Sequence, residues 1–374
     1  MTDGADSAPV DSRPNDSHSE PTPPDDSDAP PTPADGVLRY WGESRILTVT
    51  ASTATILDPE SGNVWVLPDL GGFGAGSRVV CSGTSIWILD ARENGEDDRV
   101  IRVDPVTSTV LSEWSLGPTV RPTDIVQVGD AFWITSYAKA RIYLADSSGL
   151  SGSYLNLSDY ADTDEVPEAM GALNLGDQTL IVLARQDQAT GDPAGARLLF
   201  VDNNSYGVVN VLSLAGNSPG GAMHVDATAL YLELVSTRAA GTAAADGGIE
   251  KVDLKTLTSA GVIISDATDG RTSALSSFAR AASVVWRGFS PSTGGEWAGA
   301  WSLADGSPMQ SFPLDGRPMA MGVFEGTTLW VGENGLDNVS GALVSREAIS
   351  GAELTRSAYD GPIVAMAICP SELR

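Results

Sequence analysis

Short apolar runs separated by glycine turns recur along most of the chain, and a tryptophan closes the clearest copies. Segments 78–87, 124–133 and 321–330 align without gaps, and in each a glycine stands four residues before the tryptophan. An apolar run of this length on each side of a turn glycine is typical of two short strands that form a β-hairpin. The pattern therefore predicts repeated hairpins.

The hairpins open a longer repeat unit. Weaker copies run through 170–182, 222–232 and 273–286, and units start near positions 77, 123, 168, 220, 272, 317 and 361. Consecutive starts are therefore 44 to 52 residues apart, which is a suitable length for the four antiparallel strands of a propeller blade. The sequence predicts an all-β chain built from such blades.

The two ends of the repeat region complement each other. Segment 362–369 reads as an inner strand with nothing after it, whereas 45–51, 53–58 and 63–67 read as three strands that lack an inner strand. Pairing of the C-terminal strand with the N-terminal strands would remove the open edge of the ring. Six full units and this shared one predict a seven-bladed β-propeller of four-stranded antiparallel blades.

A different composition precedes the repeats. Residues 1–36 contain eight Pro, nine Asp or Glu, one Arg and no aromatic residue. Such a segment cannot bury enough apolar surface to fold, so we expect a disordered acidic tail before a propeller at 37–374. It resembles the tether of bacterial surface lipoproteins, which suggests a periplasmic or surface-tethered envelope protein. A solubilising extension of a cytoplasmic protein is the alternative.

Charge narrows the classes of partner. The chain carries 49 acidic against 22 basic residues, a net charge of -27, and has no block of Lys or Arg. It would repel nucleic acid phosphates and anionic lipid surfaces. No run of 18 apolar residues predicts insertion into a membrane. We expect a monomer without a cofactor.

Aspartate recurs where the third strand of a unit turns into the fourth. Asp58, Asp104, Asp202 and Asp253 occupy this position, and proline follows the first two. Aspartate at the first position of a turn accepts backbone N–H groups, so we expect turn formers. Calcium binding is the alternative, but one aspartate per blade does not form a cage.

The repeat covers nearly all of 37–374 and resembles the seven-bladed propellers of the YVTN, NHL and streptogramin-lyase class. It lacks the Gly-His and Trp-Asp pairing of WD40 blades, the double glycine of kelch blades and the sialidase box. A lyase of this class would need inner-strand His and Glu residues with magnesium. His224 is the one candidate His, and no partner matches it by motif.

The two cysteines fall on the first and last inner strands, which ring closure brings together. Cys81 and Cys369 are the only cysteines in the chain, and neither belongs to a C-x-x-C pair. A disulfide across the seam, the place where the C-terminal strand completes the blade begun by the N-terminal strands, is one interpretation. Two packed free thiols are the other. No metal site is expected from two cysteines and two histidines.

Long connections between second and third strands concentrate loop length on one face, which is the default binding surface. Four arginines enter the inner strands at this face: Arg78, Arg121, Arg271 and Arg317. A ring of them would favour a carboxylate, a phosphate or an acidic peptide. The alternative is that each arginine pairs with a carboxylate of a neighbouring blade, such as Asp124 or Glu168, and only stabilises the corner, meaning the connection that enters the inner strand.

Three further residues are candidates. His224 stands at the start of an inner strand and could reach the channel, although a structural role is the alternative. Trp297 and Tyr137 lie in or beside the long loops, where they could stack on a sugar or anchor a protein. In contrast, the repeat register of Trp87 and its equivalents indicates packing between blades.

These observations favour a non-enzymatic binding or scaffold propeller that engages a protein or an anionic ligand on its long-loop face. A metal-dependent lyase or lactone hydrolase is the alternative, on fold analogy alone. A quinone-cofactor propeller is a third reading, but the blade turns lack the repeated tryptophan of that family.

Overall fold

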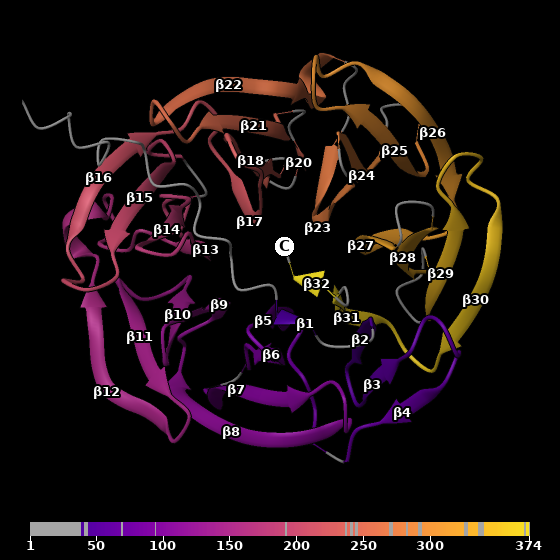
Figure 1. Cartoon of the computed structure of the whole chain (residues 1–374), viewed down its shortest axis with the longest axis horizontal. Helices are drawn as coiled ribbons and strands as arrows, with labels where there is room; N and C mark the ends of the chain where they lie inside the picture. The colour runs from indigo at the N-terminus through magenta and orange to yellow at the C-terminus, as the bar shows by residue number, and fades with distance from the viewer. Residues whose placement is uncertain are drawn as a thin grey trace, which may run out of the picture. The chain divides into compact units, whose positions relative to one another are not determined.

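The computed structural model shows seven four-stranded antiparallel sheets arranged as the blades of a ring (Figure 1). The seven predicted blades are confirmed. The structure describes residues 39–40, 44–68, 70–93, 95–190, 193–235, 238–239, 242–243, 246–268, 272–281, 283–290, 294–324, 328–335, 340–369 and 372–373. The predicted tail, 1–36, and Arg271 lie outside these residues.

Each blade runs from an inner strand at the centre to an outer strand at the rim. Blade 1 contains β31 (Ile363–Cys369), β2 (Arg45–Thr50), β3 (Ala54–Leu57) and β4 (Val64–Val66). Blade 2 contains β5 (Arg78–Ser82), β6 (Ser85–Asp90), β7 (Asp97–Asp104) and β8 (Thr109–Pro118). Blade 3 contains β9 (Pro122–Val128), β10 (Ala131–Ser136), β11 (Arg141–Asp146) and β12 (Gly149–Asn156). Blade 4 contains β13 (Ala169–Asn174), β14 (Gln178–Leu183), β15 (Arg197–Asp202) and β16 (Val208–Ser213).

The remaining blades follow the same order. Blade 5 contains β17 (Pro219–Val225), β18 (Ala229–Leu234), β21 (Gly248–Asp253) and β22 (Thr258–Ser265). Blade 6 contains β23 (Thr272–Ala281), β24 (Val284–Ser290), β25 (Glu296–Ser302) and β26 (Pro308–Leu314). Blade 7 contains β27 (Arg317–Phe324), β28 (Thr328–Asn334), β29 (Gly341–Glu347) and β30 (Glu353–Tyr359).

Small elements complete the description. They are the strand pairs β1 (Arg39–Tyr40) with β32 (Glu372–Leu373) and β19 (Arg238–Ala239) with β20 (Thr242–Ala243), and the 3-10 turns η2 (Ser158–Tyr160) and η3 (Asp266–Thr268). In the part of the chain that the structure describes, no helix is long and apolar enough to cross a membrane.

The two ends of the repeat region close the ring as predicted. β31 pairs antiparallel with β2, and Arg45 lies opposite Cys369 while Thr48 lies opposite Met366. In Figure 1 the yellow β31 therefore lies beside the indigo β2. Because blade 1 is assembled from both ends of the repeat region, its inner strand β31 is paired rather than left as an open edge.

Large apolar side chains fill the spaces between blades. Trp87 of blade 2 is fully buried, and its ring centroid lies 5.3 Å from that of Trp114 and 4.8 Å from that of Phe132 in blade 3. Trp133, Trp286 and Trp330 are buried at the equivalent positions. The tryptophans that recur in the repeat are therefore buried packing residues, as predicted.

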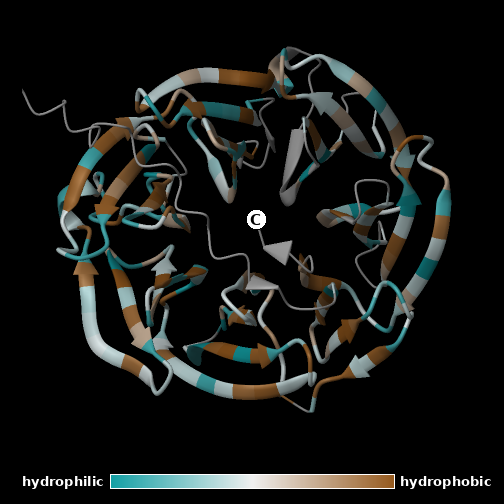
Figure 2. Ribbon diagram, in the orientation of Figure 1, coloured by the Kyte–Doolittle hydropathy of each residue, from teal (hydrophilic) through white to brown (hydrophobic). Residues whose placement is uncertain are grey.

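The outer strands face solvent on one side. In β8 the exposed and buried positions alternate along much of the strand. Figure 2 shows the same alternation of hydrophobic and hydrophilic segments along the outer ribbons. This period of two is the ordinary pattern of a half-buried antiparallel strand.

The recurring aspartates form the predicted turns. Asp104 accepts the backbone N–H groups of Val106 and Thr107, and Asp253 accepts those of Lys255 and Thr256. Asp58 and Asp202 make equivalent bonds. These carboxylates are occupied by local turn geometry.

Candidate functional site

The two faces of the ring differ in their connections. On one face the connections between second and third strands and those entering the inner strands include 67–77, 157–168 and 184–196. On the other face the hairpins are short, such as 83–84 and 129–130. Among the described connections, the long ones therefore lie on one face, as predicted.

A cavity of about 550 Å³ opens on this long-loop face and extends over blades 2 to 5. Its volume lies in the range of small-molecule sites. Its lining residues are Gly76, Arg78, Ala91, Arg92, Glu93, Gly95, Thr119, Arg121, Pro122, Thr123, Tyr137, Met170, Ala184, Gln186, Ser218, Pro219 and Val235. Three of the predicted site residues meet here: Arg78, Arg121 and Tyr137.

Arg78 reaches across the inner strands from blade 2 to blade 5. Its Nη1 donates to the carbonyl oxygens of Thr123 and Gly220 at 3.4 and 3.5 Å, which are long hydrogen bonds. Burial lowers the pKa of Arg78, and the charges of Asp124 and Glu233 offset that only in part. No carboxylate of the described residues forms an ion pair with it, so its charge is poorly compensated.

Glycine permits this approach of blade 5. A Cβ on Gly221, whose φ is +93°, would lie 2.3 Å from the carbonyl oxygen of Met170 and 3.3 Å from Nη1 of Arg78. Any side chain there would collide with a neighbouring backbone, so glycine at position 221 of the inner strand is required by packing.

Arg121 stands at the rim of the cavity on a strained connection. Thr119 and Arg121 have φ values of 58° and 51°, in the left-handed region that non-glycine residues rarely adopt. The buried carboxylate of Asp98 enforces this conformation, since it accepts the N–H groups of Val120 and Arg121 at 2.6 and 2.7 Å. Arg121 itself is exposed. No described carboxylate pairs with its guanidinium, and strained residues of this kind cluster at functional sites.

Asp98→Asn should cost about 2 kcal/mol of unfolding free energy, because an amide nitrogen would face buried N–H groups and leave them without an acceptor. The carboxylate also accepts the N–H of Arg92 at 2.6 Å, so both rim connections should loosen. Urea unfolding measures the cost. Asp97→Asn, on the neighbouring exposed position, is the control and should leave the midpoint within error. Equal midpoints for both variants would contradict this account of the rim.

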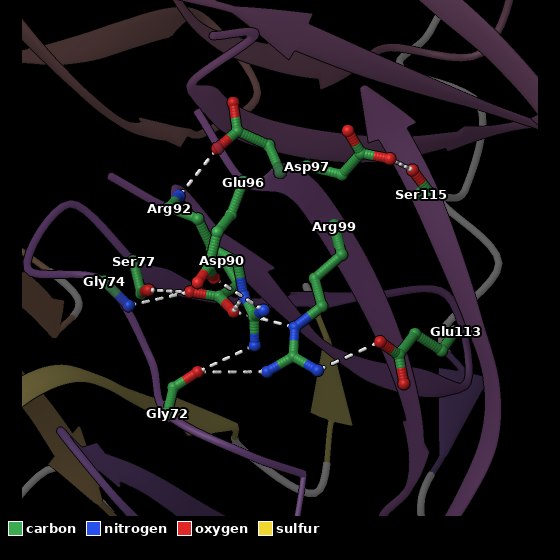
Figure 3. A network of polar contacts seen from close by, with 11 residues as sticks. Gly72, Gly74, Ser77, Asp90, Arg92, Glu96, Asp97, Arg99, Glu113 and Ser115 are labelled. Atoms are coloured by element: carbon green, nitrogen blue, oxygen red, sulfur yellow. Dashed lines mark hydrogen bonds and ion pairs between the residues drawn. The ribbon is translucent and has the colours of Figure 1, made fainter. Parts of the chain in front are cut away.

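A third arginine of the cavity is already engaged. Arg92 donates to Asp90, Glu96 and the carbonyl oxygen of Gly72 at 2.9 to 3.0 Å, and Figure 3 shows these contacts together with Arg99. Because its charge is neutralised within the network, Arg92 shapes the rim. Arg78 and Arg121 are the cations available to a ligand.

Tyr137 lies opposite Arg121 and is held by its backbone, whose N–H donates to the carbonyl oxygen of Arg121 at 2.9 Å. Gln186 forms the adjoining wall, with its side chain donating to Ser218 at 2.8 Å. Burial and the charge of Glu168 raise the pKa of Tyr137, so its hydroxyl keeps its proton. No described residue hydrogen-bonds to this hydroxyl, which can donate to a ligand.

Two carboxyl groups flank the cavity, that of Asp124 half-buried and that of Glu168 fully buried, and neither forms an ion pair with a cation of the described residues. Asp124 accepts the backbone N–H groups of Ile125 and Ala172, both at 2.8 Å. Glu168 accepts the backbone N–H of Gln186 and the side-chain amide of Gln188. Burial raises the pKa of each to about 7. Near neutral pH both acids are therefore partly protonated.

The other predicted site residues do not line this cavity. Arg317 is about half exposed, and its Nε lies 3.9 Å from Oε1 of Glu296 in blade 6. Trp297 packs beside the cluster that contains Phe289 and Trp301. Of the four arginines of the predicted ring, Arg78 and Arg121 line the cavity, Arg317 lies outside its lining, and Arg271 is not among the described residues.

His224 is near the end of β17, so its placement at the start of an inner strand was wrong. The repeat indicated where the unit starts but not where its first strand begins. This strand extends from 219 to 225, so residue 224 lies near its far end, away from the long-loop face. Burial, followed by the charge of Arg280, lowers the pKa of His224 to about 4. Arg280 donates to the carbonyl oxygen of Val225, which brings its guanidinium group close to the imidazole of His224 and favours the neutral imidazole.

The seam carries a covalent link in the structure. Cys81 of β5 and Cys369 of β31 form a disulfide with their Cα atoms 5.7 Å apart, a normal separation for such a bond. It joins the inner strand of blade 2 to that of blade 1 and spans 288 residues of sequence.

Several site residues had no signal in the sequence. Asp98, Thr123 and Gln186 acquire their roles from contacts with other connections, and the recurring glycine and tryptophan positions of the repeat mark none of them. The two adjacent glycines at the beginning of the inner strand β17, Gly220 and Gly221, were an available signal, because glycine permits close approach of a neighbouring backbone. Among the described residues, no three His, Cys, Asp or Glu side chains come together as a metal-binding group.

Comparisons with known proteins agree on the fold. No family model and no curated protein matches the sequence. A candidate 6-phosphogluconolactonase from Bacteroides uniformis matches with a TM-score of 0.58 and 12% identity, over 87% of this chain and 99% of that one. Apo AztD from Citrobacter koseri gives 0.52 and 11%, over 88% and 99%. Dihydro-heme d1 dehydrogenase NirN gives 0.53 and 14%, over 86% and 74%. The chain is therefore a seven-bladed β-propeller, similar to these proteins in its fold.

Proposed function

We propose that this propeller is a binding protein that holds an anionic group, of a small molecule or of a partner protein, in the cavity of its long-loop face. The observation that carries the proposal is the pair Arg78 and Arg121, two guanidinium groups in one cavity without an ion pair among the described residues. An anion that accepted bidentate hydrogen bonds from them would compensate both charges.

Binding rather than catalysis is supported by the lining. The charged lining residues are Arg78, Arg92, Arg121 and Glu93, and the lining contains neither His nor Cys. The hydroxyl of Thr123 is engaged with Thr135 and the carbonyl oxygen of Ala169. The hydroxyl of Ser218 accepts a hydrogen bond from the side chain of Gln186, and that of Thr119 accepts one from the ammonium group of Lys139. Among the described residues, none of these hydroxyls is hydrogen-bonded to a carboxylate or an imidazole, the kind of general base that activates a nucleophile.

We further propose an oxidising compartment, the periplasm or the cell surface, with the acidic tail as a tether. The Cys81–Cys369 disulfide supports this location, because such bonds persist outside the reducing cytoplasm. Mass spectrometry after thiol alkylation of protein from its native host tests it. Two alkylated cysteines in unreduced protein would argue for the cytoplasm.

Arg121→Met should weaken the binding of anions by roughly 30-fold, since a charge-assisted bidentate contact contributes about 2 kcal/mol. Isothermal titration with a panel of carboxylates and phosphates measures this effect. Arg317→Met is the matched control: it removes an arginine from an equivalent corner that lies outside the cavity. The control should bind like the wild type.

Both variants should fold, because each replaces an exposed side chain. If Arg121→Met binds every anion as tightly as the wild type, the cavity is not the site. Equal losses in the two variants would point instead to the overall field of the protein.

A further inference from the structure

The walls of the cavity differ from its two cationic groups. Met170, Ala184, Pro122 and Pro219 are buried residues that turn their remaining surface to the cavity, and half-buried Val235 extends the same wall. Polar rim residues such as Thr119 surround the opening. An apolar wall gains free energy from an apolar ligand surface and nothing comparable from a sugar or an inorganic ion.

The charges behind the walls limit the charge of the ligand. Asp124 and Glu233 lie close enough to Arg78 to act on its charge, and Glu168 lies beside Tyr137. Glu93 adds a fourth carboxylate at the rim. One negative charge can be met by the arginines, but each further charge would face these carboxylates.

Together these features define a ligand class for the proposed binding function, on which the inference rests. We infer that the cavity takes a small organic monocarboxylate, with its carboxylate on Arg78 or Arg121 and its apolar body against Met170, Ala184 and Val235. The hydroxyl of Tyr137 supplies an additional donor to the ligand. Multiply charged phosphates and sugar acids fit this arrangement poorly.

Four probes separate charge from apolar body: 3-phenylpropionate, its neutral amide, acetate and inorganic phosphate. Isothermal titration of the full chain should show 3-phenylpropionate binding at least roughly tenfold more tightly than acetate, because the phenyl group is buried. The amide should also bind roughly tenfold more weakly, because it cannot accept two charge-assisted hydrogen bonds.

Val235→Thr tests the wall at constant shape. A hydroxyl in place of a methyl group should weaken 3-phenylpropionate roughly fivefold and leave acetate unchanged. Val211→Thr is the matched control, since Val211 is exposed on an outer strand of blade 4. It should leave both affinities unchanged.

The outcomes separate the two levels of the proposal. Equal affinities for acetate and 3-phenylpropionate, or tighter binding of phosphate, would overturn the monocarboxylate while anion binding stands. Equal binding of the acid and its amide would overturn the role of the arginines. Absence of binding by all three anions would overturn the proposed function itself.

Discussion

Reduction of the Cys81–Cys369 disulfide should lower the free energy of unfolding by about 5 kcal/mol, which is the chain-entropy value for so long a loop. The bond closes 288 residues of sequence. It also lies at the seam, where the C-terminal strand completes a blade begun at the N-terminus. Without it, the ring is closed by strand pairing and side-chain packing alone.

Urea unfolding with and without a phosphine reductant measures this effect, and alkylation followed by mass spectrometry establishes the redox state. The control is the double variant Cys81→Ala and Cys369→Ala. It should match the reduced wild type and should not respond to reductant. Alanine leaves no unpaired polar group near the apolar cluster in which Cys369 is buried.

Hydrogen exchange should locate the loss. Amides of β31 and β2 should exchange faster after reduction, whereas β14 and β15 of blade 4 should change less, because local opening begins at the seam. A reduced protein with an unchanged midpoint would mean that strand pairing closes the ring without help from the covalent bond.

The architecture could be predicted from the sequence because each clear copy of the repeat carries two independent signals of a blade. The glycine before Trp87 and Trp133 marks a hairpin turn, and the tryptophan itself packs between blades. Strand order, blade number and the closing pairing follow from periodicity and from the two incomplete ends. Such local patterns do not depend on distant contacts.

The site could be predicted in part. Equivalent corners placed Arg78, Arg121 and Arg317 on one face, but the partner of each depends on residues that no repeat specifies. Arg317 meets Glu296 of the preceding blade, whereas Arg78 reaches a glycine carbonyl 142 positions away. Periodicity fixes the face on which a residue lies, not the depth of its side chain or its partners.

Between pH 5 and pH 7 the free energy of unfolding should fall by about 2.5 kcal/mol as the pH rises. Burial raises the pKa of Asp124 from 3.8, and that of Glu168 from 4.5, to about 7. The folded protein therefore holds two protons that the unfolded chain has lost. His224 acts in the opposite direction, because its pKa falls from 6.5 to about 4 and the unfolded chain holds the extra proton.

Near the middle of this window the folded protein therefore binds about one proton more than the unfolded chain. The free energy of unfolding then falls by about 1.4 kcal/mol per pH unit. Stability from the two acids is complete below pH 4 and is lost as the pH passes 7, whereas the stability from His224 is regained above pH 4. Chemical unfolding at half-unit steps of pH measures the slope. Carboxylates with lowered pKa values, such as Asp90, change the stability below this window.

Each of two single variants should change by one the difference in bound protons between the folded and the unfolded protein, and the slope should change in proportion. Asp124→Asn removes one of the two acids and should make the profile nearly flat between pH 5 and 6.5. His224→Gln removes the opposing group and should double the slope. A wild-type slope in Asp124→Asn would show that this carboxyl group is ionised in the folded protein.

The same acids should couple anion binding to pH. Above pH 7 the carboxylate of Asp124 places a negative charge beside Arg78, and that of Glu168 places another beside Tyr137. Each charge opposes an incoming anion, so the affinity for 3-phenylpropionate should be higher at pH 6 than at pH 8. Titrations in two buffers with different enthalpies of ionisation should show proton uptake on binding at pH 7. In Asp124→Asn the uptake should decrease and the affinity at pH 8 should rise, whereas unchanged uptake would separate this carboxyl group from the ligand site.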